Sequence, residues 1–137
     1  MILIDTGPLV ALFDPRDALH GRCKTVLRTF REPLSTTVPV LTEVFHLLPP
    51  DTLGAIRLRE FLLRGGVAVW FLDQPALERS FALMERYADH PMDLADASLV
   101  TAAEALDTPR IFTIDRNDFS TYRMRRGHRN EAFEIVG

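Results

Sequence analysis

Short apolar runs and longer stretches of helical periodicity alternate along the chain. Five runs rich in apolar or β-branched residues have the length of strands, at residues 2–5, 34–38, 67–72, 110–114 and 132–136. Helical spacing of apolar residues, with proline and glycine near the ends, marks residues 9–13, 18–30, 39–48, 52–64, 75–88 and 94–106. Parallel strands need crossover connections, which helices supply. The order therefore predicts an α/β fold of three layers around a central parallel five-stranded sheet. The run at residues 67–72 is entirely apolar, which predicts a strand buried on both faces.

The composition fits one globular domain spanning residues 1–137. Of the 137 residues, 47% are hydrophobic and 26% are charged, and no linker or low-complexity tract divides them. The single cysteine, Cys23, cannot form an internal disulfide, which favours a reducing compartment, so we expect a cytoplasmic protein. The longest apolar runs extend over only a few residues, so we expect no membrane span.

Carboxylates occupy the positions where such a fold places its chemistry. Ligands of open α/β sheets bind beyond the carboxyl ends of the strands, where the strand order reverses. Asp5 ends the first predicted strand, and Asp115 directly follows the fourth. Asp96 projects into the apolar face of its helix, and Glu43 lies beside the apolar stripe of another helix. We therefore expect four acids from distant parts of the chain to meet at one rim of the sheet.

Each acid also has a purely structural explanation. Asp5 and Asp115 can cap the helices that follow them. Asp93 and Asp96 fit a capping box in which Asp93 is the N-cap residue. Glu43 can extend its carboxylate to water. Capping and function are compatible, and the functional interpretation rests on the coincidence of four acids rather than on any one.

A cluster of carboxylates needs a positive counterpart. Two carboxylates 4 Å apart repel each other by about 1 kcal/mol in water and by about 4 kcal/mol at an effective dielectric constant of 20. No lysine or histidine stands next to the four acids in the sequence. Sites made only of oxygen ligands suit hard cations. The sequence thus predicts a bound Mg²⁺ or Mn²⁺ ion.

The segments that carry these acids resemble the PIN domain, and most of all its VapC-type toxins of bacterial and archaeal toxin–antitoxin pairs. The resemblance rests on residues 2–6 (ILIDT), on the Glu43 helix, on residues 92–100 (MDLADASLV) and on residues 113–119 (TIDRNDF), in that order. It implies a metal-dependent endoribonuclease that hydrolyses RNA phosphodiester bonds with Mg²⁺ or Mn²⁺. It also implies a homodimer that a cognate antitoxin protein inhibits.

The family's site residues can be carried over position by position. The catalytic and metal-binding acids correspond to Asp5, Glu43, Asp96 and Asp115. Two auxiliary acids and two hydroxyl residues near the site correspond to Asp93, Asp118, Thr6 and Thr113.

Arginines concentrate near the end of the chain. Residues 110–130 contain six arginines and two aspartates, which favours contact with a polyanion. We predict that RNA phosphates or bases contact Arg116, Arg123, Arg125 and Arg126. A solvated basic face explains the same residues equally well.

Other functions fit the residues less well. A receiver-like or dehalogenase-like phosphatase calls for an aspartate two residues after Asp5 or for a lysine at a late strand end, but Gly7 stands there and the only lysine is Lys24. Two alternatives within the family stay open: an RNA-processing nuclease without an antitoxin, and a module that binds RNA or a partner without cleaving.

Overall fold

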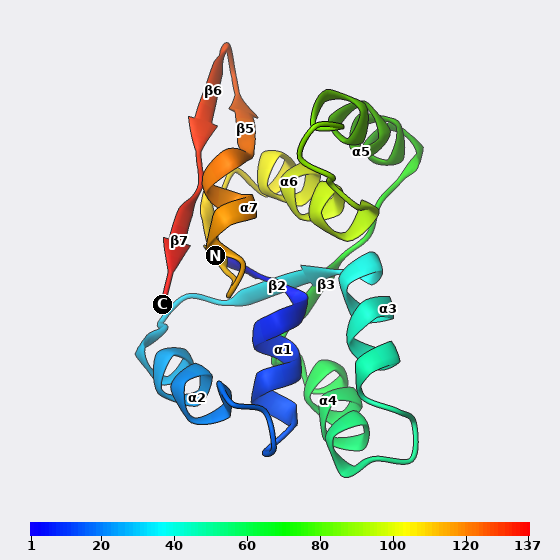
Figure 1. Cartoon of the computed structure of the whole chain (residues 1–137), viewed down its shortest axis with the longest axis vertical. Helices are drawn as coiled ribbons and strands as arrows, with labels where there is room; N and C mark the ends of the chain where they lie inside the picture. Colours follow the sequence, from blue (N-terminus) through cyan, green and yellow to red (C-terminus); the bar gives the residue numbers. More distant parts are fainter.

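Five parallel strands form the central sheet of the computed structural model, which describes residues 1–137 (Figure 1). Their order across the sheet is β3-β2-β1-β4-β7. The strands are β1 (Ile2–Ile4), β2 (Leu34–Thr37), β3 (Ala68–Trp70), β4 (Arg110–Phe112) and β7 (Glu134–Val136). The predicted α/β class and the parallel five-stranded sheet are confirmed.

Helices cover both faces of this sheet. They are α1 (Thr6–Phe13), α2 (His20–Thr29), α3 (Val38–Leu47), α4 (Leu53–Leu63), α5 (Gln74–Arg86), α6 (Leu94–Leu106) and α7 (Arg116–Thr121). Figure 1 shows α1, α2 and α4 on one side of the sheet and α5, α6 and α7 on the other. Helix α3 packs against both α1 and α6, so it joins the two layers.

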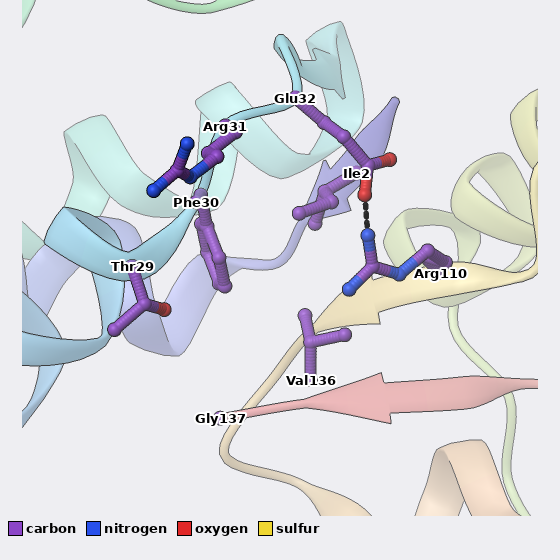
Figure 2. A pocket seen from close by; sticks show the side chains of 8 residues that line it. All are labelled: Ile2, Thr29, Phe30, Arg31, Glu32, Arg110, Val136 and Gly137. Carbon is purple, nitrogen blue, oxygen red and sulfur yellow. Dashed lines mark ion pairs between the residues drawn. The ribbon is translucent and has the colours of Figure 1, made fainter.

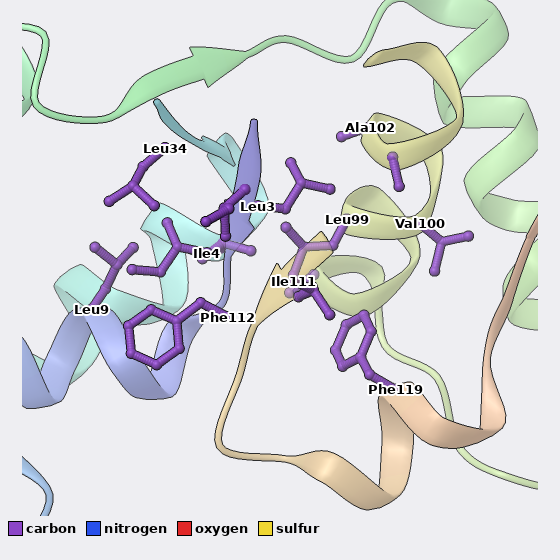
Figure 3. Close-up of a cluster of buried hydrophobic side chains, with 14 of the residues drawn as sticks. Leu3, Ile4, Leu9, Leu34, Leu99, Val100, Ala102, Ile111, Phe112 and Phe119 are labelled. Atoms are coloured by element: carbon purple, nitrogen blue, oxygen red, sulfur yellow. The ribbon is translucent and has the colours of Figure 1, made fainter. Parts of the chain in front are cut away.

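The core runs through the sheet from one helical layer to the other. Twenty-eight buried residues form one continuous hydrophobic cluster. Ile4 of β1 and Ile111 of β4 lie between Leu9 of α1 and Leu99 of α6, as Figure 3 shows, and all four side chains are fully buried. Full burial of one such side chain contributes about 1.5–3 kcal/mol to folding. The cluster therefore holds the ends of β1 and β4 rigidly, and the candidate site lies directly beyond them.

The chain path creates a switch point between β1 and β4. From β1 the chain proceeds to β2 and β3 in one direction, and it later returns to β4 and β7 on the other side of β1. In sheets of this kind the loops beyond the two central strands diverge and leave room for a ligand. Residues that follow β1 and β4 are thus placed where this fold accommodates chemistry.

The prediction that residues 67–72 form a strand buried on both faces is wrong. Strand β3 is an edge strand that pairs only with β2. Ala68 is exposed, Val69 and Trp70 are half-buried, and Phe71 beyond the strand end is 70% exposed. A continuous apolar run indicates low polarity, but it does not distinguish a central strand from an edge strand.

A β-hairpin near the end of the chain was not predicted. Strands β5 (Arg123–Arg126) and β6 (Arg129–Ala132) pair antiparallel as a separate two-stranded sheet that extends beyond the layered body (Figure 1). Gly127, at the turn, has a φ of 60°, which glycine adopts readily. Fully buried Met124 anchors β5, which packs against α6. The predicted strand at residues 132–136 is correspondingly shorter and begins at Glu134.

Candidate active site

Asp5 lies at the carboxyl end of β1 and also caps α1. Its Oδ1 accepts a hydrogen bond from the backbone N–H of Thr6 at 2.7 Å, and its Oδ2 accepts one from Thr113 Oγ1 at 2.8 Å. Its own backbone N–H donates to the carbonyl of Phe112 in β4. The residue is 8% exposed. These contacts fix the carboxylate between the two central strands.

Thr113 connects Asp5 to Asp115. The Thr113 hydroxyl that donates to Asp5 also accepts the backbone N–H of Asp115 at 3.0 Å. Asp115 then caps α7, because its Oδ1 accepts the backbone N–H of Asp118 at 3.2 Å. Asp115 is exposed, in contrast to Asp5. The loop after β4 therefore carries one acid at the surface of the site and one hydroxyl inside it.

Glu43 reaches the same region from α3. The Thr6 hydroxyl donates to Glu43 Oε1 at 3.2 Å, so the first turn of α1 contacts α3 directly beside Asp5. Glu43 and Asp93 line one open cavity of about 380 Å³ between α3 and the start of α6. The sequence placed Glu43 at the edge of an apolar stripe, and its half-buried position agrees with that.

Helix α6 supplies two further acids. Asp93 is its N-cap and accepts the backbone N–H of Asp96 at 2.8 Å, which confirms the predicted capping arrangement. Asp96 is half-buried, and its Oδ2 accepts a hydrogen bond from the hydroxyl of Tyr122 at 2.8 Å. The cap at Asp93 and the contact of Tyr122 with Asp96 involve different groups, so the two interpretations of this segment are compatible.

Burial, reinforced by repulsion between the carboxylates, raises the pKa values of three acids at the rim. Burial, opposed by hydrogen bonds and reinforced by the charges of Glu43 and Asp93, raises the pKa of Asp5 to about 6. Burial and the charges of Asp93 and Asp5 raise the pKa of Asp96 to about 8. The pKa of Glu43 is also raised, by burial and by Asp93. Electrostatic repulsion thus connects four acids at the rim, Asp5, Glu43, Asp93 and Asp96.

Asp115 and Asp118 form a pair at the edge of this acidic cluster. Their side chains share a hydrogen bond, which raises the pKa of Asp115 and lowers that of Asp118. Asp118 is among the charges that raise the pKa of Asp96, whereas Asp115 is not among the main charges acting on Asp5 or Asp96. Asp115 is therefore the least closely associated of the four predicted acids.

A histidine that the sequence did not reveal contacts Asp118, one of the two auxiliary acids. His90 Nε2 lies 2.5 Å from Asp118 Oδ1, although the two residues are 28 positions apart in the chain. His90 belongs to the connection between α5 and α6 and is half-buried. Tyr122 was likewise not predicted. Neither residue stands near an acid in the sequence, so only the packing of α5, α6 and α7 reveals them.

The donor chemistry of the cluster fits a hard divalent cation. All its donors are carboxylate and hydroxyl oxygens, which Mg²⁺ and Mn²⁺ prefer. The raised pKa values of Asp5 and Asp96 mean that the cluster retains protons near neutral pH, and a cation can take their place. In the present arrangement, no three of the acids lie close enough together to ligate a single ion. Mg²⁺ usually keeps several waters and binds directly to one or two carboxylates, so the remaining acids of the cluster could hold the ion through water.

The four predicted RNA-contacting arginines differ in availability. Arg116 and Arg125 are exposed, and neither forms a salt bridge or a side-chain hydrogen bond. The Arg123 guanidinium donates to the carbonyls of Ser120, Thr121 and Tyr122. Arg126 forms salt bridges to Asp107 and Glu131. Of the four arginines, only Arg126 has its charge paired with carboxylates, and the Arg123 guanidinium is occupied by backbone carbonyls.

A second hollow lies away from the acids and has a different character. Figure 2 shows this cavity of about 420 Å³ beside Ile2, Phe30 and Val136, with an ion pair between Glu32 and Arg110 across it. Glu32 is its only acidic lining residue, and it also binds the N-terminal ammonium group. We therefore assign the candidate site to the acidic rim. No helix of the protein has the length and apolar character needed to cross a bilayer.

The fold and the acidic rim together define a class of protein. Residues 2–123 match the PIN domain family, and the chain belongs to that family. Among curated proteins it is similar to ribonuclease VapC26 of Mycobacterium tuberculosis. The two are 30% identical over 135 residues, covering 93% of this chain and 96% of the relative. The resemblance seen in the four sequence segments is thereby confirmed.

Two solved structures share the fold. VapC20 of Mycobacterium tuberculosis, a toxin that cleaves the sarcin–ricin loop, matches with a TM-score of 0.78 at 21% identity, over 85% of this chain and 92% of the other. A chain of a toxin–antitoxin complex from Klebsiella pneumoniae matches with a TM-score of 0.70 at 23% identity, over 88% and 92% of the two chains. At these identities the likeness establishes the fold alone.

Proposed function

We propose that this protein is a divalent-metal-dependent endoribonuclease, the toxin of a toxin–antitoxin pair. The observation that carries the proposal is the pair Asp5 and Asp96. Asp5 is buried and Asp96 is half-buried at the rim of a PIN fold, and their pKa values are raised to about 6 and about 8. Carboxyl groups with pKa values shifted in this way are typical of functional sites, because unpaired buried charge is costly.

The cation-binding residues are Asp5, Glu43, Asp96 and Asp115, with Asp93 and Asp118 as auxiliary acids. Mg²⁺ or Mn²⁺ in such a site lowers the pKa of bound water and stabilises negative charge on a phosphodiester. The protein's own hydrogen bonds orient the carboxylates. Thr113 and the Thr6 backbone hold both oxygens of Asp5, and the Thr6 hydroxyl holds Glu43. Carboxylates held in this way need little rearrangement during the reaction.

Arg116 and Arg125 are the arginines best placed to bind RNA. Arg116 begins α7 directly after Asp115, and Arg125 lies on the exposed hairpin. Neither has an acidic partner, so both guanidinium groups can bind phosphates on either side of the scissile bond. Arg123 and Arg126 have roles in holding the hairpin, and we assign them weaker contacts to RNA.

An RNA cleavage assay tests the proposal. Single-stranded and looped RNA is incubated with the protein in Mg²⁺ or Mn²⁺ and separately in excess EDTA. We expect cleavage that depends on the metal and that Asp96→Ala abolishes. Asp51→Asn, a change at an exposed acid outside the site, serves as the control and should cleave like the wild type. Full activity in excess EDTA, or in Asp96→Ala, would exclude the proposed chemistry.

The same assay separates the alternatives within the family. A module that only binds RNA will retard RNA in a gel without shortening it, in the presence of either metal. The complete acidic set argues against that alternative, because a non-cleaving protein has no need to keep Asp5 and Asp96 buried together.

The antitoxin and the homodimer are proposed from the family. The curated relative is a VapC ribonuclease, and one structural match comes from a toxin–antitoxin complex. Purification of the protein expressed from its native operon should yield a small partner protein in stoichiometric amount, and the complex should be inactive. Light scattering of the purified chain at two concentrations tests the dimer. Absence of any partner would instead favour an RNA-processing nuclease of the cytoplasm.

A further inference from the structure

Two side chains outside the predicted acidic set touch the cluster, and each touches a different acid. Tyr122, which is fully buried at the end of α7, donates its hydroxyl to Asp96 Oδ2 at 2.8 Å. His90 Nε2 lies 2.5 Å from Asp118 Oδ1. No protein group bonds the other oxygen of Asp96, Oδ1. The tyrosine thus occupies one oxygen of the carboxylate and leaves the other free.

These two residues belong to one aromatic cluster, which we call the brace: Tyr87, His90, Phe119 and Tyr122. The rings of His90 and Tyr122 meet edge to face, with centroids 5.7 Å apart. Tyr87 and Phe119 contact the ring of Tyr122 at 5.2 Å each. The hydroxyl of Tyr87 accepts the backbone N–H of Arg123, the residue after Tyr122. The brace therefore locks Tyr122 in place from three sides.

We infer that Tyr122 and His90 are positioning residues, which hold the Asp96 and Asp118 carboxylates in the orientation that binds the divalent cation. The inference rests on the proposed function. A carboxylate on a short side chain otherwise rotates freely, and ordering it on binding costs free energy. Groups that hydrogen-bond to metal ligands orient them in advance, and their loss commonly reduces metal affinity 10- to 100-fold.

The hydroxyl of Tyr122 does nothing else in the structure. Its single hydrogen bond goes to Asp96, while its ring provides all of the packing within the brace. Tyr122→Phe therefore removes the contact to the acid and leaves the hydrophobic contacts intact. This separates positioning from stability.

Tyr87→Phe is a matched control. It removes the same atom from the same brace, and Tyr87 touches no carboxylate of the site. Mn²⁺ is titrated into each metal-free protein and the free ion is followed by electron paramagnetic resonance, beside kcat and KM for an RNA substrate. We expect Tyr122→Phe to bind Mn²⁺ about tenfold more weakly, with lower kcat and unchanged KM. Tyr87→Phe should stay within twofold of the wild type, and both variants should melt cooperatively.

His90 is tested by rescue. Gln presents an amide nitrogen at a similar reach to histidine Nε2, so His90→Gln should retain most of the Mn²⁺ affinity that His90→Ala loses. Equal losses in both variants would assign His90 a packing role only. Unchanged affinity in Tyr122→Phe, or an equal loss in Tyr87→Phe, would overturn the inference while the wild type still binds Mn²⁺ and cleaves RNA. A wild type that neither binds Mn²⁺ nor cleaves RNA would instead refute the proposed function, and the inference with it.

Discussion

Substitution of Asp5 by Asn provides a direct test of the electrostatic basis of the site. Asn keeps the size of the side chain and remains an effective helix cap, so α1 retains its N-terminal hydrogen bond. Asn cannot carry the buried negative charge. The pKa of Asp5 in the folded protein is about 6, against 3.8 for a free aspartate side chain. Folding therefore favours the protonated form, and this stabilisation is lost as the pH rises through about 6.

The size of the effect follows from linkage. Between pH 5 and pH 8, a carboxyl group with these two pKa values loses about 1.4 kcal/mol of folding stability. Asp5→Asn lacks this contribution, so over the same pH range it should lose about 1.4 kcal/mol less stability than the wild type, while Asp96 contributes its own loss in both proteins. Removing the charge of Asp5 also lowers the pKa of Asp96, because Asp5 is one of the charges that raise it. The loss of stability that Asp96 contributes with rising pH is therefore smaller in Asp5→Asn, which increases the difference between the two proteins. For a domain of this size, about 1.4 kcal/mol corresponds to roughly 4 °C in melting temperature.

Urea unfolding at pH 5 and pH 8, with chelator present, measures the difference. Any fixed cost of the substitution, such as a weaker contact to Thr113, cancels because the comparison is between two pH values of the same protein. Asp51→Asn, at an exposed acid with no hydrogen bond to its carboxylate, should behave like the wild type. Equal pH dependence in the wild type and in Asp5→Asn would refute the claim that Asp5 is a strained buried acid. Asp5→Asn should also cleave no RNA.

Further outcomes follow from the same structure. A hundredfold excess of Mn²⁺ over its dissociation constant should stabilise the protein by about 2.7 kcal/mol at pH 8, with a smaller shift at pH 5 because protons compete for the carboxylates; equal shifts at both pH values would argue against binding at the acids. Gly54→Ala places a Cβ 2.2 Å from the carbonyl oxygen of Phe13 and should lower the free energy of unfolding in urea by about 2 kcal/mol. Gly21→Ala lies in α2, where the added Cβ meets no atom within 4 Å outside the backbone of its own helix, and should raise that free energy by about 0.5–1 kcal/mol. Arg125→Ala should weaken RNA binding and reduce the salt slope of log Kd by about one, and Arg126→Ala, whose charge is already paired, should change the slope less.

The sequence was sufficient for the layers of the fold and for the location of the acids. Strands β1, β2 and β4 are short and separated by helices, so their pattern favours a parallel arrangement. The carboxyl ends of parallel strands lie at one edge. Asp5 and the residues after β4 therefore had to be neighbours, although they are more than a hundred positions apart.

What the sequence did not reveal depends on packing between helices. The contacts of His90 to Asp118 and of Tyr122 to Asp96 join residues 28 and 26 positions apart, across a connection and two helices. Neither residue type is unusual in its local setting, so no periodicity marks it. The β5–β6 hairpin was missed for a related reason, because β5 consists of three arginines and one anchoring apolar side chain, Met124. Alternation of this kind is too short to distinguish a strand from a loop.

Three acids of the candidate site have a structural role that is independent of the proposed chemistry, so their presence in the sequence alone does not distinguish the two roles. Asp5, Asp93 and Asp115 each cap a helix whose first turn points toward the rim. A helix N-terminus stabilises negative charge, so each cap reduces the cost of gathering carboxylates in one place. The caps do not remove that cost, because the pKa values of Asp5 and Asp96 are still raised. An Asn at a cap position preserves the helix and discards the charge. Asn variants at these three positions therefore separate what the fold requires from what the chemistry requires, which alanine variants cannot do.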